Sequence, residues 1–168
     1  RLEAKIFRSE KVDTHGGSIR VYIKKNIRIK VDSSVNKILK EEEKFGIKNF
    51  TTYQNFGNKI YEIKKNVIKN LINIRKKSQF VIGFGAPAKA TTALNFFGIS
   101  NEIDFIVEDN KLKQNKFVPG VNIPIYSKKK VTKKKPTVIV LAWNFFNEIK
   151  KNNSSLSDKF INIKDLEK

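Results

Sequence analysis

The fold of this chain is decided at Gly83-Phe84-Gly85-Ala86-Pro87-Ala88-Lys89. A hydrophobic run at 79–82 precedes this stretch, and a helix-forming run at 90–97 follows it. A strand, a two-glycine turn and a helix direct backbone N–H groups at an anion, because glycine permits the sharp turn and the helix adds a positive dipole end. We place Pro87 at the first helical position, where its missing N–H costs nothing. Lys89 adds a positive charge where a phosphate would lie.

A second hydrophobic run, 103–107, ends at Glu108. A strand, a glycine turn, a helix and a second strand with a terminal acid form a dinucleotide-type β-α-β unit. We expect Glu108 to bond a ribose or sugar hydroxyl, or else to be a polar strand end. The alternative for the turn is a tight bend with a solvated lysine. The predicted nucleotide-binding set here is Gly83, Gly85, Ala86, Pro87, Lys89 and Glu108.

Length and composition indicate one folded core. The chain has 168 residues, 39% of them hydrophobic, and 13 are phenylalanine. It has no cysteine and one histidine, so we expect neither disulfides nor a metal site. The sequence has no run of 18 apolar residues that could span a membrane. We expect a cytoplasmic location and no membrane partner. The sequence begins at Arg1 and has no methionine, which favours a piece of a longer protein over a trimmed initiator.

The net charge of +19 allows a polyanion partner, since 35 Lys and Arg face 16 Asp and Glu. The basic residues are mostly lysine, and asparagine and isoleucine are also abundant, as AT-rich coding favours. Arginine, the preferred bidentate reader of phosphate and guanine, is scarce. We therefore do not expect nucleic acid as the main partner, and a polyanion-binding module stays the alternative.

The first part of the chain predicts a hairpin and two helices. Extended segments at 2–7 and 18–23 flank a turn at 13–17 and form a hairpin that needs a larger sheet. Ser33 or Ser34 is expected to cap a helix over 35–45, with Gly46 at its end. A longer helix is expected from about Thr52 to Lys77, with an apolar stripe that packs on the sheet: Phe56, Ile60, Ile63, Val67, Leu71 and Ile74.

The remaining elements complete an α/β pattern. A basic loop at 110–120 and a short extended piece at 123–125 precede a lysine run at 128–135, which we expect to be solvated surface. A buried, parallel-type strand at 137–142, a helix entered through 143–149 and a final strand at 160–163 follow. The predicted fold is a three-layer, Rossmann-like α/β open sheet, mostly parallel. We assign 26–168 to this domain and 1–25 to the terminal β-hairpin of a preceding domain.

Four ordered blocks resemble a known family. These blocks are His15-Gly16-Gly17-Ser18-Ile19-Arg20; the 83–89 stretch; Lys113-Gln114 with Phe117-x-Pro119-Gly120 and Ile123-Pro124-Ile125; and Trp143-Asn144-Phe145 with Glu148-Ile149. Over nearly its whole length the chain resembles the C-terminal domain of S-adenosylmethionine-dependent nucleotide-sugar C-methyltransferases. It departs from the family pattern at Ala90, Glu108, Lys111 and Asn115, and asparagine tolerates the left-handed conformation that the last position needs.

The resemblance implies a transferase of deoxysugar biosynthesis that methylates a carbon of a nucleotide-linked keto-deoxysugar. A zinc-binding region and a central methyltransferase domain would precede this portion. The central domain would bind S-adenosylmethionine and hold the catalytic cluster, so we expect no cofactor, no catalytic residue and no activity in this fragment alone. Its expected partners are the nucleotide diphosphate-sugar and the upstream methyltransferase domain.

Five further residues are candidates for contact with that substrate. His15, Ser18 and Arg20 are possible substrate contacts, against a loop histidine bonded to backbone and a solvent-facing Arg20. Lys113 either clamps a phosphate or belongs to the loop surface. Asn144 follows a buried strand at the sheet edge where α/β proteins bind ligands. An NAD(P)-binding Rossmann domain is a further alternative, although a second mononucleotide-binding half has little room in so short a chain.

Overall fold

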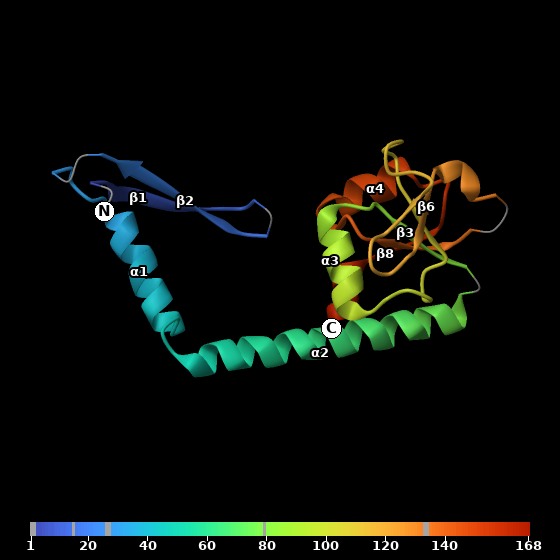
Figure 1. The fold of residues 1–168 in the computed structure, drawn as a ribbon, viewed down its shortest axis with the longest axis horizontal. Helices are drawn as coiled ribbons and strands as arrows, with labels where there is room; N and C mark the ends of the chain where they lie inside the picture. The colour runs from blue at the N-terminus through green and yellow to red at the C-terminus, as the bar shows by residue number, and fades with distance from the viewer. Residues whose placement is uncertain (1–2, 15, 26–27, 79, 133–134) are drawn as a thin grey trace. The chain divides into compact units, whose positions relative to one another are not determined.

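A computed structural model describes residues 3–14, 16–25, 28–78, 80–132 and 135–168 (Figure 1). The chain divides into two compact units, residues 1–58 and 59–168, which are described separately. The boundary lies within one helix, α2 (Phe50–Lys77). Among the described residues, no helix is both long and apolar enough to cross a membrane.

The first unit contains the predicted hairpin, a short helix and the start of α2. Strands β1 (Lys5–Val12) and β2 (Ser18–Lys24) pair antiparallel, and α1 (Ser33–Phe45) follows. The cap of α1 is Asp32, whose carboxylate accepts the Ser34 N–H at 2.8 Å, so the expected serine cap is wrong. Ser34 is used elsewhere, because its hydroxyl accepts the N–H of Ser9 at 3.2 Å and ties α1 to β1. Gly46 ends the helix in the left-handed conformation, as predicted.

The second unit is a six-stranded sheet in the order β5-β6-β4-β3-β7-β8. Its strands are β3 (Val81–Phe84), β4 (Phe105–Val107), β5 (Lys116–Phe117), β6 (Pro124–Tyr126), β7 (Thr137–Val140) and β8 (Lys159–Asn162). All neighbours pair in parallel except β5 with β6. The predicted Rossmann-like, mostly parallel α/β sheet with a preceding hairpin is confirmed.

Helices cover both faces of this sheet (Figure 1). Residues of α2 and α3 (Ala88–Phe97), among them Val67, Leu71 and Leu94, belong to the core on one face. Residues of α4 (Phe146–Asn152) pack against the core on the other face. Short 3₁₀ turns lie at Lys128–Lys130, Trp143–Phe145 and Ile163–Glu167. Phe56 departs from the predicted stripe: it is 64% exposed, because it lies in the part of α2 that belongs to the first unit.

A bidentate ion pair fixes the end of α2 to the sheet. The Arg75 guanidinium donates to both carboxylate oxygens of Asp104 at 2.6 and 2.8 Å. Asp104 also accepts the N–H of Val81 at 2.9 Å, at the start of β3. The hydrogen bond to Asp104 raises the pKa of Arg75. These contacts join α2 to the starts of β3 and β4, at the edge opposite their carboxyl ends.

Candidate functional site

A pocket of about 490 Å³ lies at the carboxyl ends of β3, β4 and β7. From β3, the chain adds β4 and β6 on one side and then β7 and β8 on the other, so the strand order reverses between β3 and β7. Open α/β sheets bind ligands at this switch point. The lining residues lie at or beyond these strand ends and in and around α4: Phe84, Gly85, Pro87, Glu108, Asp109, Lys113, Lys128, Ala142, Phe145, Glu148, Ile149, Asn152 and Asn153.

Glycine is required at the two positions of the motif for different reasons. Gly83 is within β3, not in the turn as expected, and a Cβ there would lie 2.9 Å from side-chain atoms of Ile106 and Leu141. Gly85 makes the turn with φ +86°, and a Cβ there would lie 2.8 Å from the Cβ of Ala142. Close packing of neighbouring strands therefore requires Gly83, while the backbone conformation and the approach to Ala142 both require Gly85.

Pro87 precedes the helix by one residue. It is the N-cap of α3, with φ −73° and ψ 164°, so its predicted place at the first helical position is wrong. The extended backbone suits proline because its ring fixes only φ. The Pro87 carbonyl accepts the N–H groups of Ala90 and Thr91 at 2.9 and 3.3 Å. The Pro87 carbonyl is thus the first hydrogen-bond acceptor of α3.

Glu108 is bonded to the glycine turn. Its Oε2 accepts the Ala86 N–H at 2.8 Å, and its Oε1 accepts the Asn110 N–H at 3.0 Å. The neighbouring Gly85 N–H donates to the Val107 carbonyl at 2.8 Å. Two N–H groups predicted to face an anion therefore already have acceptors within the chain, and one of these acceptors is a carboxylate.

The loop after β4 closes against the same turn. Lys113 Nζ donates to the Ala86 carbonyl at 2.9 Å and lies 3.9 Å from Glu108 Oε2. Gln114 donates to the Glu108 carbonyl at 2.7 Å. Asn115 adopts φ +59°, the left-handed conformation expected for it. The structure thus brings Gly85, Ala86, Glu108 and Lys113 together.

Lys89 and Asn144 do not line this pocket. Lys89 Nζ lies 5.6 Å from the centre of the Trp143 ring. Asn144 lines a neighbouring depression of about 330 Å³ together with Trp143 and Glu148. The predicted nucleotide-binding residues therefore fall into two adjacent groups, and Glu148 lines both hollows.

Several lining residues were not among the predicted site residues, notably Asp109, Lys128, Phe145 and Glu148. The Lys128 ammonium lies 3.1 Å from an Asp109 carboxylate oxygen and 5.7 Å from the centre of the Phe84 ring. This lysine belongs to the run expected to be solvated surface, yet it lines the pocket. The signal was available, because Lys128 follows β6 and Asp109 follows β4 by two residues each, and parallel strand ends share one edge.

The other candidates lie in the first unit. His15 is outside the described residues. The Ser18 hydroxyl donates to the Thr14 carbonyl at 3.1 Å. Arg20 donates to Glu10 at 2.8 Å, and the Tyr22 hydroxyl donates to the same oxygen at 2.9 Å. The hydrogen bond from Tyr22, together with Arg20, lowers the pKa of Glu10. Tyr22 and Glu10 in turn raise the pKa of Arg20. Ser18 and Arg20 thus have partners within the hairpin.

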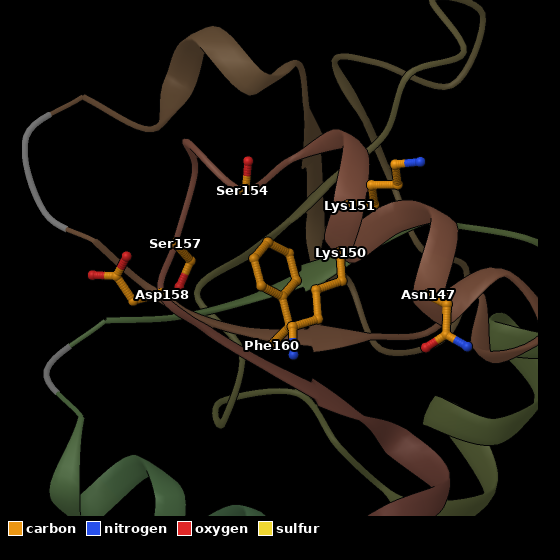
Figure 2. Close-up of a pocket in the computed structure, with 7 residues that line it drawn as sticks. All are labelled: Asn147, Lys150, Lys151, Ser154, Ser157, Asp158 and Phe160. Carbon is orange, nitrogen blue, oxygen red and sulfur yellow. The ribbon is translucent and has the colours of Figure 1, made fainter.

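A larger hollow, of about 610 Å³, contains none of the predicted residues. Figure 2 shows its lining side chains, which come from α4, the turn after it and the region of β8: Asn147, Lys150, Lys151, Ser154, Ser157, Asp158 and Phe160. The Ser157 hydroxyl is committed to the fold, because it bonds the Pro136 carbonyl and accepts the Lys159 N–H at 2.9 Å. Within the described ranges, no cluster of three or more His, Cys, Asp and Glu could hold a metal ion.

The Rossmann-like sheet has a pocket at its switch point, the place where open α/β sheets bind ligands. Residues 13–162 match the C-methyltransferase C-terminal domain, and the chain belongs to this family. It is similar to the C-methyltransferase NovU of Streptomyces niveus, with 32% identity over 140 residues. That alignment covers 82% of this chain and 33% of the relative, so the chain spans about a third of the length of this curated relative.

Proposed function

We propose that this chain is the substrate-binding, C-terminal portion of an S-adenosylmethionine-dependent C-methyltransferase that acts on a nucleotide-linked keto-deoxysugar. The observation that supports this most is the pocket at the switch point of the sheet. The family glycine turn and Lys113 both contribute to that pocket, and the adjacent group of Lys89 and Asn144 adds a cation and an amide. The chain would bind and orient the nucleotide diphosphate-sugar.

In this proposal the methyl donor would be bound by another domain of the protein. A nucleoside ribose at a Rossmann turn is held by an acid with free oxygens. Here each oxygen of Glu108 already accepts a backbone N–H group, so this acid has fewer acceptor sites left for a ribose. An upstream methyltransferase domain would bind the donor, which supplies the methyl group, and the present chain would position the sugar. Positioning of reactants carries a large part of many rate enhancements.

The hairpin would be the link to that upstream domain. A two-stranded sheet is marginally stable by itself. Three apolar residues of β2 are largely exposed: Ile19 by 48%, Val21 by 48% and Ile23 by 59%. Residues 1–25 would therefore complete a larger sheet, as the division at residue 25 predicts.

Calorimetric titration tests the proposal. The chain would be titrated with dTDP-glucose, dTDP and a short polyphosphate at two salt concentrations, beside Lys89→Ala and the matched control Lys151→Ala. We expect saturable binding at one site, preference for the nucleotide-sugar and loss of affinity only in Lys89→Ala. Unselective binding of every polyanion that falls steeply with salt, with both variants affected equally, would replace the proposal by a polyanion module.

A further inference from the structure

The switch-point pocket is acidic in a strongly basic protein. Three carboxylates line it, those of Glu108, Asp109 and Glu148, against two ammonium groups, those of Lys113 and Lys128. The chain as a whole has a net charge of +19. The pocket thus has a small excess of negative charge in a positively charged protein, and this excess disfavours anionic ligands.

Both lysines are already engaged. Lys113 Nζ donates to the Ala86 carbonyl at 2.9 Å, and Lys128 Nζ pairs with Asp109 at 3.1 Å. A phosphate that recruited either ammonium would compete with the oxygen that the ammonium already contacts, the Ala86 carbonyl or the Asp109 carboxylate. A charged group is a strong hydrogen-bond partner, and leaving its former acceptor unpaired has a cost.

The glycine turn does not offer the usual phosphate cradle. The Gly85 and Ala86 N–H groups donate to Val107 and Glu108, each at 2.8 Å. A phosphate at this place would also meet the Glu108 carboxylate, and like charges within a few ångströms repel each other. The contacts that make the turn therefore disfavour a diphosphate at the place where a dinucleotide-binding fold would hold it.

The same lining suits a neutral, hydroxyl-bearing ring. Among the described residues, the Glu148 carboxylate has no hydrogen-bond or ion-pair partner, so both of its oxygens can accept hydroxyl protons. The Asn153 amide donates to the Ile149 carbonyl at 2.7 Å, which leaves its side-chain oxygen as an acceptor. Phe145 is 60% exposed at the rim and offers an apolar surface to ring C–H groups. A few polar groups beside aromatic rings are typical of small-molecule sites.

We propose that this pocket binds the neutral sugar ring of the substrate through acceptors of hydroxyl protons, with Glu148 as the principal one, and that the diphosphate lies outside it. This inference rests on the proposed function and specifies which part of the nucleotide-sugar occupies the pocket. Glu148 would be a specificity-determining residue, because it accepts from hydroxyls and repels phosphate.

Amide NMR spectra of the chain with two separate probes test the inference. The probes are methyl α-L-rhamnopyranoside, a neutral deoxyhexoside, and inorganic pyrophosphate. We expect the glycoside to shift the amides of Gly85, Phe145 and Glu148, and pyrophosphate to leave them unchanged. Shifts of these amides by pyrophosphate, or by neither probe, would overturn the inference. If the glycoside shifts them while dTDP-glucose does not bind, the pocket binds a neutral sugar ring but the proposed nucleotide-sugar function fails.

A charge-matched pair of variants makes the test specific. Glu148→Gln removes one acceptor charge from the pocket, and Glu62→Gln removes the same charge from an exposed position on α2. We expect Glu148→Gln to weaken glycoside binding about tenfold, the effect of one hydrogen bond to a charged group, and Glu62→Gln to leave it unchanged. A Glu148→Gln variant that binds the glycoside as tightly as the unsubstituted chain would overturn the assignment of Glu148.

Discussion

The two sheets of this chain differ in how they bury their apolar residues. In the six-stranded sheet, Ile82, Val138 and Ile139 are fully buried between helices. In the two-stranded sheet, Val21 and Ile23 are 48% and 59% exposed. The larger sheet supplies its own core and holds the pocket. A two-stranded hairpin is marginally stable by itself, and this one leaves apolar side chains of β2 exposed, as expected of a segment that completes another sheet.

The largest expected effect is a cavity in the larger sheet. Ile139→Ala should lower the free energy of unfolding by about 3 kcal/mol, because it removes most of a fully buried side chain from the interior strand β7. The same change in the hairpin, Ile23→Ala, should cost less than about 0.5 kcal/mol since that side chain is 59% exposed. Urea unfolding followed by circular dichroism measures both. Equal losses would remove the distinction between the sheets.

A smaller effect concerns the glycine turn of the pocket. Gly85→Ala should destabilise the second unit by about 2–3 kcal/mol, since its φ of +86° and a contact of 2.8 Å with Ala142 both oppose a Cβ. Gly98→Ala is the matched control: it has φ +76° but no atom within 4 Å of the added Cβ, so about 1–2 kcal/mol is expected. Fluorescence of Trp143, the single tryptophan, reports unfolding of this unit. Identical losses would show that strain alone explains Gly85.

Next is the ion pair that joins α2 to the sheet. Arg75→Lys should lower stability by about 1 kcal/mol, because lysine cannot make both hydrogen bonds to Asp104 and the pair is partly exposed. Lys76→Arg, at an exposed neighbouring position, serves as the control. Thermal unfolding followed by Trp143 fluorescence measures the difference. An unchanged midpoint for Arg75→Lys would mean that charge, without the bidentate geometry, suffices.

The smallest expected effect is a titration in the hairpin. The Tyr22 hydroxyl, with Arg20, lowers the pKa of Glu10 below its ordinary value of 4.5. Ionised Glu10 therefore stabilises the hairpin above that value, and this contribution is lost as the pH falls through the lowered pKa. Tyr22→Phe should move the pKa back toward 4.5, as carboxyl NMR shifts would show. A pKa that does not move would assign the effect to Arg20 and Arg8.

The order of the elements was predictable from the sequence because hydrophobic runs and punctuating glycines fix it. The errors concern local geometry. Two glycines close together suggest a turn for Gly83, but the close approach of Ile106 in β4 and of Leu141 just after β7 decides its place. The cap at Asp32 was missed because three potential caps stand in succession and the partner of Ser34, Ser9, lies far away in sequence.

Part of the pocket was predictable for the same reason. Gly85 and Glu108 come from motifs next to strand ends, and Lys113 comes from a block that resembles the family. The partners that occupy the turn could not be predicted, because a sequence does not show that the Glu108 side chain bends back to the Ala86 N–H. Glu148 belongs to the family block with Trp143, yet its place between two hollows follows only from the folding of α4 over the sheet.

A crystal structure of the chain with dTDP-glucose tests the central claim most directly. The account predicts the glucosyl ring between Phe145 and Glu148 at the ends of β3 and β7, with the diphosphate outside the pocket. A nucleotide-sugar held only by the lysines of the hollow in Figure 2, or a diphosphate bound to the Gly85 and Ala86 N–H groups in place of Glu108, would contradict it.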